Sequence, residues 1–242
     1  MDTEQLADKL VSWIRDKVLS GGCRGVVIGL SGGIDSSVLA VLCRRALPED
    51  TLAVMMPCGS NPQDGEHACL VADKFSIPVM EVGLDGVFDA FLQALPDYRV
   101  APKVSRMAQA NLKARLRMIA LYYIANQLRY LVAGASNRSE LATGYFTKHG
   151  DGGVDIMPLG GLVKAQVVEL AGYLGVPQEI IDKPPSAGLW QGQTDEADMG
   201  FSYTALDRYL LTGEASGELR DRIEALLAAS GHKRSLPPIA DF

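Results

Sequence analysis

A glycine- and serine-rich segment that follows a short apolar run gives the clearest chemical signal in the sequence. Residues 31–37 read Ser-Gly-Gly-Ile-Asp-Ser-Ser, directly after Gly25–Leu30, which reads GVVIGL. Glycines let backbone amides approach a ligand closely, and the start of a following helix supplies unpaired N–H groups and positive dipole charge. Ser31, Ser36 and Ser37 add hydroxyl donors. The pattern predicts an anion-binding loop at the carboxyl end of a strand.

Asp35 places a carboxylate inside this loop, where it would repel a phosphate unless a cation such as Mg²⁺ lay between them. No GK[ST] motif follows and no GxGxxG is present, so the segment is neither the Walker loop nor the dinucleotide-binding fingerprint. A tight turn in which Asp35 and Ser36 merely favour the start of a helix would explain the same residues. We favour the anion site because the whole string directly follows a buried strand.

Strand-like and helix-like segments alternate along the first part of the chain. Short apolar runs, which suit buried strands, lie at 25–30, 51–56, 78–82 and 130–133. Helical periodicity falls at 3–19 (with Thr3 as the expected N-cap), 36–46, 66–75, 85–95 and 105–127. This alternation predicts an α/β fold: a doubly wound, mostly parallel sheet with helices on both faces.

The pattern changes after Leu141. Residues 143–161 hold six glycines and no sustained periodicity, so we expect a loop long enough to have a function. Helices are expected at 164–174, 203–211 and 217–229, with an irregular stretch at 183–200. No repeat or low-complexity tract divides the chain, so we expect one domain over residues 1–242.

The composition excludes several classes of protein. The chain has 242 residues, 48% of them apolar, and Lys+Arg 23 against Asp+Glu 29 gives a net charge of −6. An acidic chain without a basic block is a poor candidate for general nucleic-acid binding or for a membrane surface. The most apolar stretch, 120–135, is interrupted by Asn126, Gln127 and Arg129, so no run reaches the length that spans a bilayer. We expect neither a nucleic acid nor a membrane as partner.

Cysteine usage points to a reducing compartment. Cys23, Cys43, Cys58 and Cys69 form no CxxC pair, which makes a disulfide scaffold or a zinc module improbable. The N-terminus, Met-Asp-Thr-Glu-Gln, is acidic and unlike a signal peptide. We therefore expect a reduced, cytoplasmic protein.

Ordered motifs along the whole chain resemble those of the NAD synthetase family. The SGGIDSS string is similar to the loop of the ATP pyrophosphatases, which split ATP between the α and β phosphates. The further motifs are NLKARLRM at 111–118, SNRSEL at 136–141, GYFTKHGDGG at 144–153, PLGGLVK at 158–164, KPPSAGLW at 183–190 and His232-Lys233-Arg234. The resemblance implies a ligase that makes NAD⁺ from deamido-NAD⁺: ATP adenylates the nicotinate carboxylate, and ammonia then displaces AMP. It also implies Mg²⁺ as cofactor and a homodimer.

The resemblance assigns roles to the residues at matching positions. Contacts with ATP or pyrophosphate fall on Gly29, Leu30, Ser31, Gly32, Gly33, Ile34, Asp35, Ser36, Ser37, Ala135, Lys164 and Ser186. Contacts with deamido-NAD⁺ fall on Asn111, Arg115, Tyr122, Lys148, Asp155, His232 and Lys233. Asp35 and Glu140 would bind Mg²⁺. Asp151 and Lys164 would act in catalysis.

Helical spacing independently groups three of the residues expected to contact deamido-NAD⁺. Asn111, Arg115, Met118 and Tyr122 are spaced 4, 3 and 4 residues apart, so they share one face of a helix. Such a face could recognise something flat and anionic, or it could simply be solvated. A second stripe is expected to face the core: Leu112, Leu116, Ile119 and Tyr123.

Local structure offers alternatives for the charged residues. Glu140 stands three residues after Asn137, which is capping-box spacing, and a cap need not exclude a metal-binding role. Lys164 begins a helix, where a cation is mildly unfavourable against the helix dipole. That location suggests a role for Lys164 other than stabilising the helix, although surface lysines at this position are common.

The glycine-rich loop and the tail also allow plain explanations. Lys148, Asp151 and Asp155 could be polar residues of a solvated turn, and His232-Lys233 an ordinary polar tail. Trp190 could stack on a base or pack against a partner chain. The resemblance instead implies a flexible lid that excludes water from the acyl-adenylate.

Two positions depart from the family pattern. Gly134-Ala135 stands where many relatives have Gly-Thr, and Met55-Met56 where some carry an arginine near the adenine. These departures affect expected nucleotide contacts and not the reaction.

The expected nitrogen donor is free ammonia. Relatives that use glutamine carry an extra amidase domain with a catalytic cysteine, whereas all four cysteines here fall in the synthetase-like region. No glutaminase domain is expected, and a separate glutaminase is the alternative. Two rival functions remain. Another ligase with this loop would need a purine or RNA site, and a nucleotide-sensing module would need neither the carboxylate pair nor the glycine-rich loop.

Overall fold

The computed structural model describes the chain except residues 1, 97–100, 187, 189, 191 and 241–242. Four parallel strands form one sheet in the order β3-β2-β1-β4. They are β1 (Gly25–Gly29), β2 (Thr51–Met55), β3 (Val79–Glu81) and β4 (Tyr130–Ala133). Parallel neighbours joined by helical crossovers confirm the predicted α/β class.

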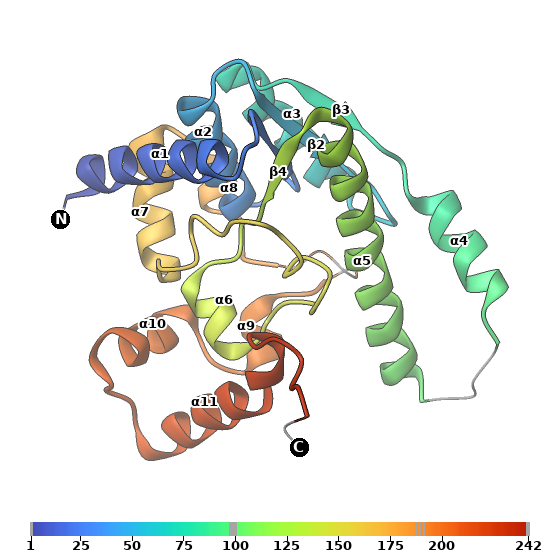
Figure 1. Cartoon of the computed structure of the whole chain (residues 1–242). Helices are drawn as coiled ribbons and strands as arrows, with labels where there is room; N and C mark the ends of the chain where they lie inside the picture. The colour runs from blue at the N-terminus through green and yellow to red at the C-terminus, as the bar shows by residue number, and fades with distance from the viewer. Residues whose placement is uncertain (1, 97–100, 187, 189, 191, 241–242) are drawn as a thin grey trace.

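Each face of the sheet has its own core, because successive side chains of a strand point to opposite sides. Val26 and Ile28 are fully buried against α1 (Thr3–Ser20), α2 (Ile34–Ala46) and α7 (Lys164–Leu174). Val27, between them, is buried on the other side with residues of α5 (Pro102–Leu128). Burying each such side chain contributes about 1.5–3 kcal/mol. The predicted two-faced arrangement is therefore correct (Figure 1).

The C-terminal helices build a third group below the sheet, as Figure 1 shows. Met199, Tyr203, Leu206 and Ile223 form its small buried core. The remaining helices are α3 (Pro62–Phe75), α4 (Asp85–Ala94), α6 (Arg138–Thr143), α8 (Gln178–Ile181), α9 (Asp195–Met199), α10 (Tyr203–Thr212), α11 (Gly217–Ala229) and the 3₁₀ turn η1 (Gly231–Lys233). Among the described helices, none combines the length and apolar character needed to cross a bilayer.

Several expected element boundaries need correction. Asp2, not Thr3, caps α1, since its carboxylate accepts from the backbone N–H of Gln5. α3 begins four residues earlier than expected, at Pro62, because Asn61 supplies an N-cap and proline is favoured at the first helical position. The short helix α6 lies partly where only a loop was expected.

The apolar stripe on α5 was assigned partly to the wrong side. Leu116 is buried as expected, but Ile119 and Tyr123 are 58% and 65% exposed. The sheet-facing side is set by Leu121 and Ile124. Helix positions two residues apart point in nearly opposite directions, so Ile119 and Tyr123 lie on the far side from Leu121.

The strand order creates a topological switch point at the carboxyl ends of β1 and β4. From β1 the chain proceeds to β2 and β3 on one side, and it later returns to place β4 on the other side. Loops leaving β1 and β4 therefore diverge, and open α/β sheets bind ligands at such a switch point. The predicted anion loop follows β1, and the SNRSEL motif follows β4 (Figure 1).

Close backbone approach at Gly25 generates a prediction. An added Cβ there would collide with the carbonyl oxygen of Asp50 and lie 2.5 Å from ring carbons of Tyr130. We expect Gly25→Ala to lower the free energy of unfolding by about 1–3 kcal/mol, the usual cost of overpacking. Gly172→Ala in α7 is the matched control, since a Cβ there meets nothing within 4 Å. Chemical denaturation of both variants is the measurement, and equal stabilities would contradict the expectation.

Candidate active site

The loop after β1 is held in shape by its own serines. Gly32 has φ +74°, a left-handed conformation that favours glycine. The hydroxyls of Ser36 and Ser37 donate to the carbonyl of Gly33 at 2.9 and 2.8 Å. Among the described residues no side chain caps the N-terminus of α2 at Gly33. The loop thus presents an uncapped helix start, which is suited to an anion.

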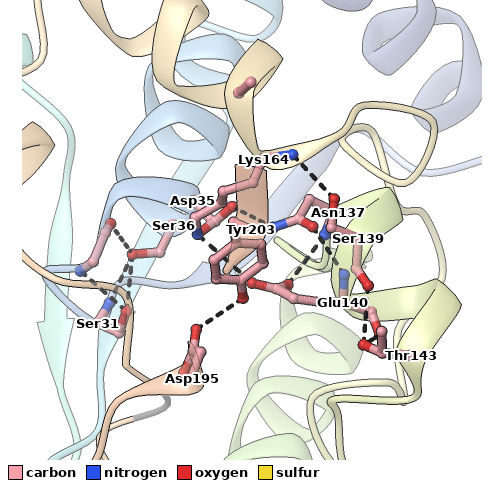
Figure 2. Close-up of polar contacts among 12 residues, drawn as sticks. Ser31, Asp35, Ser36, Asn137, Ser139, Glu140, Thr143, Lys164, Asp195 and Tyr203 are labelled. Carbon is pink, nitrogen blue, oxygen red and sulfur yellow. Dashed lines mark hydrogen bonds and ion pairs between the residues drawn. The ribbon is translucent and has the colours of Figure 1, made fainter. Parts of the chain in front are cut away.

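Asp35, in the first turn of α2, is the centre of a charged cluster (Figure 2). Its Oδ2 accepts from the Nζ of Lys164 at 2.5 Å, and its Oδ1 accepts from the Nδ2 of Asn137 at 2.9 Å. Lys164 is only 5% exposed. Three segments far apart in sequence therefore meet on one carboxylate.

Glu140 completes the cluster and also caps α6. Its Oε2 accepts from the backbone N–H of Asn137, while its own N–H donates to the Oδ1 of Asn137. Its Oε1 lies 3.7 Å from the Nζ of Lys164. Both roles considered for Glu140 are thus geometrically compatible: the cap is present, and the carboxylate still faces the lysine.

Lys164 is placed by contacts at the start of α7. Its backbone N–H donates to the Oγ of Ser139, and the next N–H donates to the Oδ2 of Asp207 in α10. These acceptors satisfy helix N–H groups and offset the unfavourable cation. The ring of Tyr203 lies 5.2 Å from the Nζ, and its hydroxyl donates to Asp195 at 2.9 Å. Figure 2 shows the bond from Lys164 to Ser139, and Tyr203 between Lys164 and Asp195.

Burial and charge shift the titration of this cluster. Burial, reinforced by Asp35, raises the pKa of Glu140 to about 8. Burial alone would lower the pKa of Lys164, but Asp35 and Glu140 outweigh it and raise that pKa. Two carboxylates share one ammonium, so ionised Glu140 leaves an excess of one negative charge.

The donor set of the cluster fits a hard cation. Carboxylate oxygens of Asp35 and Glu140 flank one existing positive charge, the ammonium of Lys164. Within the described part of the chain no group of three or more His, Cys, Asp or Glu is placed to hold a metal. Mg²⁺ characteristically takes one or two carboxylates and completes its shell with phosphate oxygens and water. Two carboxylates are therefore compatible with that ion.

The polar face of α5 holds the glycine-rich loop. Asn111 accepts from the Oγ1 of Thr147, and Arg115 donates to the carbonyl of Lys148. Tyr122 donates to the Oδ1 of Asp155 at 2.9 Å. The predicted common face is confirmed, and its side chains reach successive parts of one loop.

The other predicted residues of the loop and tail also contact each other. The Nζ of Lys233 donates to the carbonyls of Gly144 and Phe146, both at 2.7 Å. The Nζ of Lys148 donates to the carbonyl of His232. Asp151 accepts from the backbone N–H of Thr147. The bonds of the two lysines tie the tail to the loop, whereas the Asp151 bond lies within the loop. Direct contact of these residues with a substrate stays a prediction.

Ser186, Trp190 and Ala135 lie in different surroundings. Ser186 is exposed and accepts from the N–H of Gly188. The guanidinium of Arg106 in α5 lies 5.9 Å from the ring of Trp190. Ala135 is partly buried and packs against the core. Its methyl group cannot donate the hydrogen bond that a threonine hydroxyl could donate at this position.

An arginine does lie at the end of β2, although it comes from another part of the chain. Arg117 of α5 donates from Nε to the carbonyl of Met56 and from Nη2 to the hydroxyl of Ser60. Sequence reasoning noted the absence of an arginine beside Met55-Met56 and missed this one. No local pattern signals a contact across 61 residues.

Comparison with known proteins agrees with the motifs. The chain matches the family model described as NAD synthase over residues 6–237. The chain belongs to this family. An NH(3)-dependent NAD(+) synthetase from Carboxydothermus hydrogenoformans is 48% identical, covering 98% of this chain and 97% of that protein.

Solved structures of other proteins are also similar to this chain. The NMN synthetase from Francisella tularensis has a TM-score of 0.93 at 39% identity, with full coverage of both chains. The NH3-dependent NAD synthetase from Campylobacter jejuni has a TM-score of 0.83 at 30% identity, again with full coverage. The fold and the arrangement of elements are therefore those of the family.

Sequence reasoning missed the residues that support the cluster. Asn137, Asp195, Tyr203 and Asp207 were assigned no part in it, apart from the spacing of Asn137 as a cap. The Asn137–Asp35 bond spans 102 residues. Only a three-dimensional arrangement reveals it.

The raised pKa of Glu140 predicts a pH-dependent effect on stability. A carboxyl whose folded pKa lies above its unfolded value stabilises the fold fully below the unfolded pKa and loses that contribution as pH rises. For Glu140 the window runs from 4.5 to about 8. We expect Glu140→Gln to gain stability relative to the unsubstituted protein across this window, and denaturation at several pH values measures it. The exposed Glu169→Gln is the control, and a difference between Glu140→Gln and the unsubstituted protein that is independent of pH would contradict the expectation.

Proposed function

We propose that this protein converts deamido-NAD⁺ to NAD⁺, using ATP and ammonia and releasing AMP and pyrophosphate. The observation that carries the proposal is the Asp35–Lys164–Glu140 cluster beside the uncapped start of α2. It combines an anion site with oxygen ligands for a cation. The family's curated members carry the name of this reaction at 43–48% identity.

In the first step, a nicotinate carboxylate oxygen attacks the α-phosphorus of ATP, and pyrophosphate leaves with the electron pair of the broken P–O bond. Negative charge grows on the leaving pyrophosphate. The N–H groups at the start of α2 and the ammonium of Lys164 would stabilise it, because preorganised donors act best where charge develops. The hydroxyl of Ser31 lies in the same loop and would add a further donor.

Asp35 and Glu140 would hold Mg²⁺, which when bound supplies positive charge to phosphate oxygens. Two carboxylates face the single ammonium of Lys164, so a bound cation would balance the charge that Glu140 carries once it ionises. Ser186 and the backbone at Ala135 would contact ATP from the neighbouring segments.

In the second step, ammonia attacks the carbonyl carbon of the adenylate, and AMP leaves with the former carboxylate oxygen. Asp151 is the proposed group that orients ammonia or takes its proton. The glycine-rich loop would exclude water, which otherwise hydrolyses the adenylate. Its ties to Asn111, Arg115 and Tyr122 would place Lys148 and Asp155 beside deamido-NAD⁺.

A mononucleotide acceptor is the second candidate. Its support is the TM-score of 0.93 to an NMN synthetase, against 0.83 to an NH3-dependent NAD synthetase. The same amide-forming chemistry applies to both nicotinate carboxylates. We favour the dinucleotide because curated relatives at 43–48% identity are named for it.

Product analysis distinguishes these candidates. The protein is supplied with ATP and Mg²⁺, with either deamido-NAD⁺ or nicotinate mononucleotide, and with either ammonium or glutamine. We expect NAD⁺ with equimolar AMP and pyrophosphate from the dinucleotide and ammonium. Faster amidation of the mononucleotide would favour the second candidate. Production of ADP in place of AMP would contradict both.

Removing the Asp35 charge tests the cation assignment. We expect Asp35→Asn to lower turnover by about 10²- to 10³-fold, as loss of a preorganised electrostatic contact typically does. Asp50→Asn is the matched control. Asp50 also accepts a side-chain hydrogen bond, from Tyr130, but it precedes β2 at the opposite end of the sheet. Near-normal turnover of Asp35→Asn over a range of Mg²⁺ concentrations would refute the assignment.

We also propose a single synthetase domain, a homodimer and a cytoplasmic location. Ile119 and Tyr123 of α5 support the dimer, since they expose apolar surface on one side of a long helix. The four cysteines are free, which suits a reducing compartment. Light scattering in solution tests the dimer.

A further inference from the structure

A second lysine, Lys183, lies near the loop of residues 31–37, which we call the phosphate loop. It is not part of the cluster of Asp35, Glu140 and Lys164. The Nζ of Lys183 donates to the Oδ1 of Asp64 at 2.5 Å and lies 3.4 Å from the Nδ1 of His67. Both partners belong to α3. The side chains of Lys183 and Asp64 are 25% and 22% exposed, so the pair is largely shielded from water. Sequence reasoning quoted Lys183 within a motif but gave it no role.

Asp64 also adjoins the phosphate loop through its backbone. A Cβ added at Gly32 would collide with the carbonyl oxygen of Asp64. On its other side, a Cβ at Gly188 would lie 3.6 Å from the Oδ2 of Asp64. Asp64 therefore lies between the phosphate loop and the segment that carries Ser186.

A stiff connection joins Lys183 to Ser186. The two intervening residues are Pro184 and Pro185. Because the proline ring fixes φ, this connection has little backbone freedom. The carbonyl of Pro185 accepts from the N–H of Asp195 at 3.1 Å, which fixes the far end. The position of Lys183 thus determines where Ser186 lies relative to the loop.

We propose that Lys183 and Asp64 form a positioning pair that fixes the Ser186 segment against the phosphate loop before ATP binds. This inference rests on the proposed function, because it takes both segments as contacts of ATP. Lys183 acts through Asp64 and does not itself touch the phosphates. Preorganising the two segments lowers the ordering cost that ATP binding would otherwise carry.

The test measures ATP binding without turnover. Calorimetric titration with ATP and Mg²⁺, with no nicotinate acceptor, is applied to Lys183→Met, Asp64→Asn and the double variant. We expect each single variant to raise the Kd for ATP about tenfold, and the double variant to match the singles, because both remove one shared contact. In steady-state assays, KM for ATP rises while KM for the acceptor stays unchanged.

Control variants separate positioning from a general loss of structure. Arg208→Met removes another ion pair, Arg208–Glu214, whose side chains are 69% and 64% exposed and which lies in and after α10. It is expected to bind ATP normally. Lys183→Arg keeps the charge and is expected to recover most of the affinity.

Two results would overturn the proposal. Normal ATP binding by Asp64→Asn together with weak binding by Lys183→Met would mean that Lys183 contacts the phosphates directly. Normal binding by both single variants would mean that the pair has no part in ATP binding. Because the titration needs no acceptor, a protein that binds ATP as expected but forms no amide would count against the proposed function alone.

Discussion

The ammonium of Lys164, held between the carboxylates of Asp35 and Glu140, is the contact on which the site depends. Neither carboxylate belongs to the same element as the lysine. Asp35 follows β1, Glu140 follows β4, and Lys164 begins α7. The parallel sheet brings the first two together because neighbouring parallel strands end at one edge. Core packing of α7 against α1 and α2 then brings the third.

A buried charge cluster is costly unless its members are paired and hydrogen-bonded. Here the supporting groups come from the C-terminal helices. Asp207 receives the N–H of the residue after Lys164, and Tyr203 places its ring beside the ammonium. The third group of helices therefore has a clear part in the site: it satisfies the start of α7 and shields the lysine from water.

The glycine-rich loop and the C-terminal tail are held by individual hydrogen bonds and not by a buried charge cluster. Lys148, Asp155 and Lys233 all bond to protein groups in this structure. Such a hydrogen bond contributes only about 0.5–1.5 kcal/mol net, so a substrate carrying carboxylate, phosphate and ribose groups could exchange for several of them. The glycine-rich loop is thus held to α5 by several weak bonds, and its rearrangement around a substrate stays a prediction.

Local signals predicted the elements well, and they predicted the contacts between elements poorly. The bounds of β4 and α7 agree with expectation, because an apolar run and a helical period each report on neighbours in sequence. α6 was missed since its six residues are too few to show a period. The bond between Asn137 and Asp35, like that between Lys183 and Asp64, depends on the crossing of distant segments. Motif resemblance proposed which residues act, and the structure adds which residues hold them.

An isotope-transfer measurement tests the central claim, that this protein activates a nicotinate carboxylate by adenylation. Deamido-NAD⁺ labelled with ¹⁸O in that carboxylate is converted with ATP and ammonium, and the AMP is examined by mass spectrometry. An adenylate requires one labelled oxygen to leave with AMP. Unlabelled AMP, or label in released phosphate or pyrophosphate, would contradict the account.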